Sequence, residues 1–256
     1  MAKVKTLILR APGTNCDAEA AFAFEQAGSA VDSAHINQLV RRGKLIADYQ
    51  ILVMPGGFTY GDDISAGRIL ANELKLKLGE DIKRFVERGG LILGICNGFQ
   101  VLVKAGILPP IANGQRQQLT LSGNDSNRFE CRWVYLQISQ GSPCIFTRGI
   151  SAMYLPIAHG EGKITAEEET LKQLNVVARY ADAKGDTKAG YPSNPNGSVD
   201  NIAGICDATG RIFSLMPHPE RFISWTQHPR WTREAPRRYG DGLGIFLNAV
   251  DWVKRS

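Results

Sequence analysis

Short apolar runs that stop at turns rich in glycine or proline constrain the fold of this chain more than any other feature. Such runs occur at residues 7–9, 51–54 and 91–95, and each is predicted to be a buried strand. Residues 18–27, which are rich in Ala and Glu and precede Gly28, predict a helix after the first run. Apolar strands that alternate with helices predict an α/β fold, in which helices cover both faces of a mostly parallel sheet.

The rest of the chain extends this pattern and then changes it. In the α/β part we also predict a strand at 30–36 and helices at 64–78, at 81–88, from residue 99 onwards and at 244–254. The middle region favours strands, which we expect to form a small antiparallel addition beside the main sheet, at 128–138, 153–157 and 176–180. A hairpin signal joins strands at 202–206 and 211–216, and a loop is predicted at 191–198.

The composition is that of an ordinary globular protein, with 43% hydrophobic and 21% charged residues. No low-complexity linker divides the chain, so we expect residues 1–256 to form a single domain. The first residues carry no signal-peptide pattern, and no run reaches the roughly 20 apolar residues of a membrane span. We therefore expect a cytoplasmic protein that does not contact membranes.

Cysteine, histidine and charge patterns exclude further classes of function. The 5 cysteines form no CxxC pair or zinc-site spacing, and the 4 histidines are scattered, so we expect free thiols and no metal centre. The formal net charge is +5, but Lys and Arg are mostly interleaved with Asp and Glu, which argues against a nucleic-acid partner. The exception contains Arg230, Arg233, Arg237 and Arg238, which we interpret as a solvated loop or a dock for an acidic protein surface.

The strongest local signal is Gly94-Ile95-Cys96-Asn97-Gly98, which follows a predicted strand and begins a helix. A nucleophile elbow requires this context, here with Cys in place of Ser. We expect side chains at positions 94 and 98 to crowd the strained turn, and the helix N-terminus to favour a thiolate. The alternative is a buried core cysteine, but the flanking glycines favour catalysis. Cys16, just beyond the first strand, lacks such glycines.

A candidate base follows the last predicted strand, in Met216-Pro217-His218-Pro219-Glu220. Residues two apart in an extended segment project to the same side, so His218 and Glu220 can face one cleft. An imidazole that acts as base and then as acid needs an acceptor for its second nitrogen, which Glu220 can provide. His228 has no carboxylate two residues later, and we interpret it as a loop histidine.

Two further segments have the composition of substrate contacts. Pro55-Gly56-Gly57-Phe58 follows the third strand, at the same edge of a parallel sheet as Cys96. We expect the N–H of Gly57 or Phe58, together with that of Asn97, to form an oxyanion hole; the alternative is a simple tight turn. Gln100 lies one helical turn after Cys96. It is a candidate to hold an α-amino or α-carboxylate group of the substrate; the alternative is a solvated helix residue.

The three motifs, in this order, resemble those of class I, triad-type glutamine amidotransferases. The resemblance is closest to the glutaminase subunits of phosphoribosylformylglycinamidine synthases. It is carried by Pro12-Gly13-Thr14-Asn15-Cys16-Asp17, Phe58-Thr59-Tyr60-Gly61-Asp62-Asp63, Arg128-Phe129-Glu130-Cys131-Arg132, His159-Gly160-Glu161-Gly162, Asn194-Pro195-Asn196-Gly197-Ser198 and Met216-Pro217-His218-Pro219-Glu220-Arg221. It implies a flavodoxin-like, three-layer fold.

The resemblance also implies an activity and partners. Members of this family hydrolyse L-glutamine and pass ammonia to a separate synthetase subunit, which uses ATP and Mg²⁺ to make formylglycinamidine ribonucleotide. A small third subunit often bridges the two. By the same resemblance, the chain carries no cofactor of its own, His159 lines the glutamine pocket or the partner interface, and residues 222–243 form a surface extension before the last helix.

Two rival interpretations are open at this point. The first is a glutaminase of the same fold that serves another synthetase, because only the family motifs point to the acceptor. The second is a non-catalytic or redox-sensing cysteine protein that acts as an interaction module. The second interpretation requires no His218–Glu220 pair and no reaction of Cys96 with glutamine.

Overall fold

The computed structural model describes residues 3–41, 45–62, 65–110 and 117–256. The helices within this range are α1 (Asp17–Gln26), α2 (Ile36–Arg41), α3 (Arg68–Glu73), α4 (Gly79–Glu87), α5 (Asn97–Lys104), α6 (Glu168–Gln173) and α7 (Leu243–Arg255). Short 3-10 turns lie at Leu45–Asp48, Thr59–Asp62, Val199–Asn201, Pro219–Arg221 and Trp225–Gln227.

The described strands form two sheets. Nine belong to the main sheet, in the spatial order β2 (Ala30–His35), β1 (Lys5–Arg10), β3 (Ile51–Met54), β4 (Leu91–Ile95), β11 (Ile212–Leu215), β10 (Ile202–Cys206), β9 (Asn175–Ala181), β6 (Glu130–Ile138) and β7 (Ala152–His159). The small second sheet pairs β5 (Leu119–Gly123) with β8 (Glu161–Ala166) in antiparallel fashion.

The main sheet changes character at β10. From β2 to β11 every neighbouring pair is parallel, whereas β10, β9, β6 and β7 continue the sheet in antiparallel pairs. The predicted middle strands therefore extend the main sheet instead of standing beside it. The reason is that β10 turns back along β11 and offers its other edge to β9. The separate antiparallel addition is the β5–β8 pair, which the sequence did not predict.

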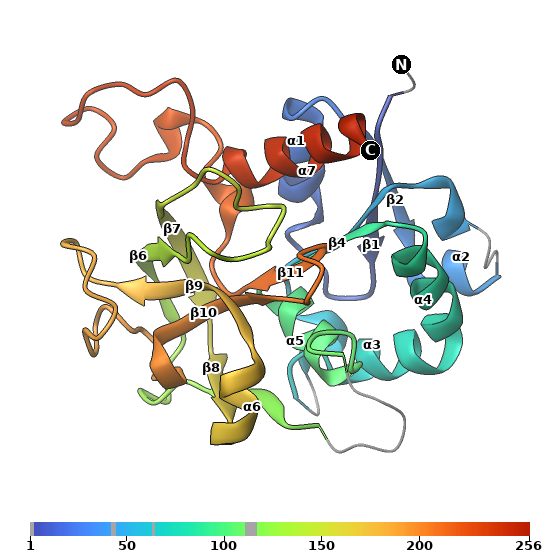
Figure 1. Ribbon diagram of the computed structural model, residues 1–256, viewed down its shortest axis with the longest axis horizontal. Coiled ribbons are helices and arrows are strands. Elements are labelled where there is room, and N and C mark those ends of the chain that lie inside the picture. Colours follow the sequence, from blue (N-terminus) through green and yellow to red (C-terminus); the bar gives the residue numbers. More distant parts are fainter. Residues whose placement is uncertain (1–2, 42–44, 63–64, 111–116) are drawn as a thin grey trace.

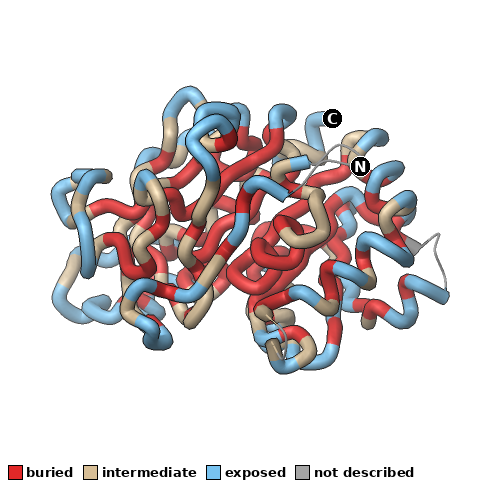
Figure 2. Tube along the Cα trace, turned by 90° about the horizontal axis from the view of Figure 1, so that it is seen from below, coloured by how far each residue is buried: buried red, intermediate tan, exposed pale blue. Residues whose placement is uncertain are grey.

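Helices cover both faces of the parallel part of the sheet (Figure 1). There α1 and α7 lie on one side, and α3 and α5 lie on the other. Phe24 of α1 and Phe246 of α7 meet edge to face, with ring centroids 5.0 Å apart. The buried residues form a continuous interior between these layers (Figure 2). The three-layer α/β architecture predicted from the sequence is confirmed.

The helical region before β4 differs in detail from the prediction. The helix predicted at 64–78 begins at Arg68 in α3, and residue 64 lies outside the described residues. A π-helical turn at Leu74–Leu78 joins α3 directly to α4, so two predicted helices form one stretch. Leu74 and Leu78 are buried, and the wide turn keeps both on the inner face, whereas Leu76 points outward at 81% exposure.

The segment 222–243 is only partly a surface extension. Trp225 and His228 are buried and stack on each other, with ring centroids 4.8 Å apart. Arg237 lies over the Trp225 ring, whereas Trp231 is 47% exposed. His228 is thus a loop residue, as predicted, but one that is packed against the core.

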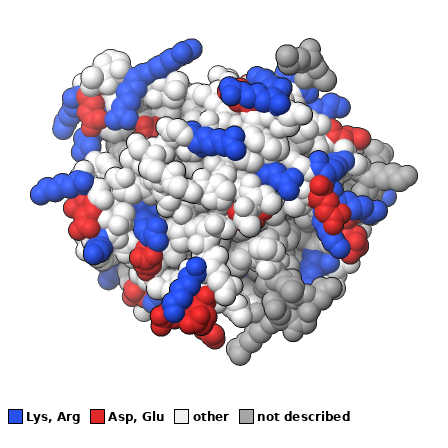
Figure 3. Space-filling view, viewed as in Figure 1, with Lys and Arg blue, Asp and Glu red and all other residues white. Residues whose placement is uncertain are grey.

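On the face shown in Figure 3, Lys and Arg side chains are scattered among Asp and Glu side chains and form no continuous basic stripe. In the basic segment, Arg230 pairs with Glu234 and Arg237 pairs with Asp241. Within the described residues, every helix is too short or too polar to cross a lipid bilayer.

The packing of α5 on β3 generates a first prediction. A Cβ added at Gly98 would lie 1.9 Å from the backbone oxygen of Met54, so we expect Gly98→Ala to destabilise the fold by about 1–3 kcal/mol through overpacking. The matched control is Gly79→Ala in α4, where the nearest atom is 4.0 Å from the added Cβ. This control should be neutral or stabilising. Urea unfolding of both variants measures the difference, and equal stabilities would contradict the prediction.

Candidate active site

Four loops that carry the candidate residues meet at one edge of the sheet. Strands β1, β3, β4 and β11 run parallel, and each predicted segment follows the end of one of them. Cys16 follows β1, Gly56 and Gly57 follow β3, Cys96 follows β4, and His218 follows β11. Residues far apart in the sequence thus come together because the strands share a direction.

Cys96 occupies a strained turn between β4 and α5. Its backbone has φ 51° and ψ −107°, a conformation that L-residues rarely adopt. It immediately precedes the first turn of α5, whose first N–H groups have no partner within the helix. This geometry confirms the elbow that the sequence predicted. The residue is buried at 4% exposure, so the thiol is nearly closed off from water in this conformation.

The flanking glycines leave room both within the elbow and toward the neighbouring strands. A Cβ at position 94 would lie 3.1 Å from the Gly98 carbonyl oxygen, as expected for a crowded turn, and 2.5 Å from Ser214 Oγ on β11. A Cβ at position 98 would lie 1.9 Å from the Met54 carbonyl oxygen at the end of β3. Both glycines therefore also allow the elbow to approach the neighbouring strands.

His218 and Glu220 form a buried pair beside the elbow. Nδ1 of His218 lies 2.6 Å from Oε1 of Glu220, and each residue is 1% exposed. The two lie on either side of Pro219 at the start of a 3-10 turn, and the His218 N–H donates to the Pro156 carbonyl. Because Nδ1 is engaged, Nε2 is the nitrogen available to a thiol. Within the described residues Nε2 makes no hydrogen bond.

The charged neighbours of His218 outweigh its burial. Burial alone would lower the pKa of this imidazole, because it disfavours the charged form. The Glu220 carboxylate, and then the sulfurs of Cys96 and Cys16, raise the pKa well above its ordinary value. The arrangement therefore favours an imidazolium next to the thiol, which is the state that stabilises a thiolate.

One of the two expected oxyanion donors of the Gly-Gly turn is already engaged. The Phe58 N–H donates to the Gly13 carbonyl at 2.9 Å. Phe58 is 44% exposed, and its ring lies beside that of Phe129. In this conformation the Phe58 N–H is therefore not free to donate to an oxyanion, whereas the Gly57 N–H makes no hydrogen bond among the described residues. Gly57 stays the candidate donor of this turn.

The side chains of Asn97 and Gln100 are used inside the fold. Asn97 Oδ1 accepts from Thr59 Oγ1 at 2.7 Å, and its Nδ2 donates to Gln100 Oε1 at 2.9 Å. Gln100 Nε2 donates to the Glu161 carbonyl at 2.5 Å. Gln100 is 3% exposed, and both ends of its amide are occupied. This geometry corrects its assignment as a glutamine ligand: Gln100 connects α5 to β8.

His159 lies at the end of β7, close to the site. It is buried, and its Nδ1 lies 3.1 Å from Asn124 Oδ1, whereas its Nε2 has no partner among the described residues. Burial, and then repulsion from His218, lower the pKa of His159 to about 4. His159 is therefore neutral at pH 7, unlike His218.

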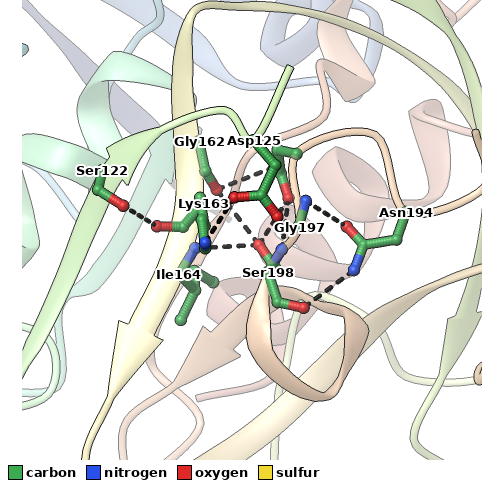
Figure 4. A network of polar contacts seen from close by, with 9 residues as sticks. Ser122, Asp125, Gly162, Lys163, Ile164, Asn194, Gly197 and Ser198 are labelled. Carbon is green, nitrogen blue, oxygen red and sulfur yellow. Dashed lines mark hydrogen bonds and ion pairs between the residues drawn. The ribbon is translucent and has the colours of Figure 1, made fainter. Parts of the chain in front are cut away.

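The loop at 191–198, with its Asn-Pro-Asn-Gly-Ser motif, supports the strand that follows His159 (Figure 4). Ser198 Oγ accepts from the Ile164 N–H at 3.0 Å, and Asn194 accepts from the Gly197 N–H at 3.0 Å. A Cβ at Gly162 would lie 2.5 Å from the His159 ring. This motif therefore braces the backbone next to His159.

Cys16 also lies at the site, although no role for it follows from the sequence. Its sulfur, a His218 ring nitrogen and a Glu220 carboxylate oxygen all lie within 4.8 Å of one another. Such a set of atoms can hold a metal ion, but Arg221 Nη2 donates to the same sulfur at 3.0 Å. The guanidinium charge and the His218–Glu220 hydrogen bond disfavour a cation here. In the sequence, Cys16 was marked by its position after the first strand and by its place in the Pro12–Asp17 motif, but neither gave it a role.

Comparisons with known proteins agree with this geometry. Residues 3–253 match the CobB/CobQ-like glutamine amidotransferase domain. The chain is 57% identical to the phosphoribosylformylglycinamidine synthase subunit PurQ of Dehalococcoides mccartyi, over 100% of both chains. It is 44% identical to PurQ of Methanococcus maripaludis, over 98% of both chains. The chain belongs to the CobB/CobQ-like glutamine amidotransferase family, in the branch of the PurQ subunits.

Solved structures support the same fold. The structure of PurLQS from Thermotoga maritima matches with a TM-score of 0.75 and 30% identity, over 98% of this chain and 100% of that chain. A glutamine amidotransferase from the same organism matches with a TM-score of 0.55 and 16% identity, over 100% of this chain and 98% of that chain. The second match concerns the fold alone. The glutamine amidotransferase fold expected from the motifs is thus confirmed.

The strained backbone of this amidotransferase at Cys96 generates a second prediction. Glycine adopts positive φ without strain, so we expect Cys96→Gly to be more stable than Cys96→Ala by about 1–3 kcal/mol. Denaturant unfolding of the two inactive variants measures this difference. The control is Ala105→Gly at the end of α5, where φ is −77° and glycine should destabilise instead. A less stable glycine variant at position 96 would contradict the strain.

The depressed pKa of His159 generates a third prediction. In the unfolded chain the imidazole binds a proton near its ordinary pKa of 6.5, whereas in the folded chain it does so only near pH 4. Protons therefore favour the unfolded chain as the pH falls from 6.5 to 4, and at pH 5 we expect this residue to cost about 2 kcal/mol of stability relative to pH 7.

The test compares His159→Gln with the unsubstituted chain by urea unfolding at pH 7 and at pH 5. The contributions of distant ionisable groups are common to both proteins and cancel. His218, which repels His159, is the interacting neighbour, and its pKa should rise when this repulsion is removed. The variant should lose less stability between the two pH values. Equal losses would mean that His159 titrates normally in the folded chain.

Proposed function

We propose that this chain is the glutaminase subunit of a phosphoribosylformylglycinamidine synthase. It hydrolyses L-glutamine and passes the ammonia to an ATP-dependent synthetase subunit, which converts formylglycinamide ribonucleotide to formylglycinamidine ribonucleotide in purine biosynthesis. The observation that carries the proposal is the 57% identity to a PurQ subunit over the full length of both chains. The buried pairing of His218 with Glu220 beside Cys96 supports the chemistry.

The proposed reaction starts from the state in which the Cys96 proton has moved to His218, so that a thiolate faces an imidazolium. The thiolate attacks the side-chain carboxamide carbon of glutamine, and the carbonyl oxygen becomes an oxyanion. The N–H groups of Gly57 and Asn97 are the proposed donors to that oxyanion, each worth about 3–4 kcal/mol of transition-state stabilisation in comparable sites. His218 then gives its proton to the nitrogen, so that ammonia leaves and a γ-glutamyl thioester remains.

The second half of the reaction releases glutamate. His218, now neutral, takes a proton from water as the water attacks the thioester carbon. Collapse of the tetrahedral intermediate breaks the carbon–sulfur bond, and the sulfur leaves as thiolate. Throughout, Glu220 holds Nδ1 of the imidazole and stabilises its charged form, as expected from their 2.6 Å contact. His159, neutral beside the pair, is proposed as part of the wall of the glutamine pocket.

This chemistry needs no metal or organic cofactor on the chain. ATP and Mg²⁺ are proposed to act on the synthetase subunit. A small bridging subunit is part of the proposed complex, and the cytoplasm is the proposed location because purine precursors are made there. A glutaminase serving another synthetase remains the alternative, and its acceptor would differ.

Replacement of the nucleophile tests the function directly. We expect Cys96→Ala, reconstituted with the synthetase, to lose glutamine-dependent product formation by about 10³-fold or more, because covalent catalysis is abolished. The same complex should keep its activity with ammonium, which enters after the thioester chemistry. Product is measured as formylglycinamidine ribonucleotide. The nucleophile would be misassigned if glutamine still served as donor, and the acceptor would be misassigned if ammonium also failed with the unsubstituted chain.

A further inference from the structure

Cys16 is buried between the Gly56-Gly57 turn and the segment that carries His218 and Glu220. It ends the loop after β1 and directly precedes α1, and it is 1% exposed. Its sulfur donates to Asn15 Oδ1 at 3.1 Å and accepts from Arg221 Nη2 at 3.0 Å. A thiol in such a polar setting is not an ordinary core cysteine, because an apolar environment would leave its sulfur without partners.

The sulfur of Cys16 lies near the catalytic imidazole, within 4.8 Å of one of its ring nitrogens. A Cβ built at Gly56 would lie 2.8 Å from Cε1 of His218 and 3.1 Å from the sulfur of Cys16. The ring edge and the sulfur therefore line the same small space, which stays open only because position 56 is a glycine. Any other side chain at position 56 would displace one of them.

Backbone hydrogen bonds connect the segments around Cys16 to the Gly56-Gly57 turn and to His218. The N–H groups of Asn15 and Cys16 donate to the Gly56 carbonyl, in the turn that carries Gly57. Arg221 belongs to the same 3-10 turn as Glu220, and its N–H donates to the His218 carbonyl at 3.3 Å. The hydrogen bond between Arg221 and the Cys16 sulfur thus links the Gly56-Gly57 turn to the 3-10 turn that follows His218.

We propose that Cys16, held by Arg221, is a positioning residue for the catalytic imidazole of His218. A hydrogen bond to Glu220 alone fixes Nδ1 but leaves the ring able to tilt about that bond. The Cys16 sulfur, within 4.8 Å of a ring nitrogen of His218, restricts this tilt and keeps Nε2 available to Cys96. Misplacement of a catalytic group by about 1 Å can cost about 10²-fold in rate, so such a restraint has a measurable effect.

Cys16 also belongs to the charge balance around His218. The ionisable groups that face or adjoin this imidazole are Glu220, Cys96, Cys16 and His159, and Arg221 acts through Cys16. Burial lowers the pKa of Arg221, but Cys16 and then Glu220 raise it above its usual value. Removal of the Cys16 sulfur takes away an acceptor that supports the imidazolium, so the pKa of His218 should fall.

This inference rests on the proposed function, and the test uses the complex reconstituted with its synthetase. The variants are Cys16→Ala, Cys16→Ser and Arg221→Lys. Cys131→Ser is the matched control, because Cys131 is an exposed cysteine on β6. We measure kcat and KM for glutamine, the pH profile of kcat/KM, and thermal unfolding of each variant.

We expect Cys16→Ala to lower kcat by at least about tenfold with little change in KM, because a tilted base weakens the chemical step and not binding. The alkaline limb of its pH profile should move to lower pH, because an imidazolium of lower pKa loses its proton earlier. Cys16→Ser, which restores a polar acceptor, should recover part of both effects, and Arg221→Lys should fall between Cys16→Ala and the unsubstituted chain.

The outcomes distinguish the proposed function from the proposed role of Cys16. An unsubstituted complex that forms no product from glutamine overturns the function itself. A working complex in which Cys16→Ala behaves like Cys131→Ser overturns the positioning role alone. A uniform loss of kcat with an unmoved alkaline limb also overturns it, since that is the signature of a merely structural cysteine. If Cys16→Ala does not fold, Cys16→Ser and Arg221→Lys decide by the same two readouts.

Discussion

Four parallel strands that end at the same edge of the sheet bring together every group the reaction uses. Their loops supply the nucleophile, its base, the Gly-Gly turn and Cys16, from segments spread over some two hundred residues of chain. No single loop holds more than one of these parts. The geometry therefore depends on the register between strands, and a shift of β4 or β11 by one residue would separate Cys96 from His218.

Burial and the charge of the neighbouring groups together set the protonation states at this edge. Two histidines lie close together, and the carboxylate beside His218 supports its charge, whereas His159 has an amide beside it and stays neutral. Two imidazoles with opposite pKa shifts allow the site to keep one proton in a defined place. A polar network through Asn97, Gln100 and the backbone of Glu161 fixes the start of α5. The site is thus built from the polar interior of the fold and not from its surface.

The sequence predicted the parts that depend on local pattern. The elbow at Cys96 and the His218–Glu220 pair could be identified because glycine spacing and a His-Pro-Glu triplet carry their chemistry within a few residues. Gln100 was misassigned because its partner, a backbone carbonyl of β8, lies in a strand that the sequence did not predict. Cys16 could not be assigned, since its partner Arg221 lies at the other end of the chain. Pairings across long sequence separations leave no local signal.

The burial of Cys96 and His218 has a consequence for the charges at the site. They expose 4% and 1% of their surfaces, so bulk water has little access to the sulfur or the imidazole. Charges on these two groups are therefore weakly screened by solvent, and their mutual attraction is stronger than the same contact would be at the protein surface.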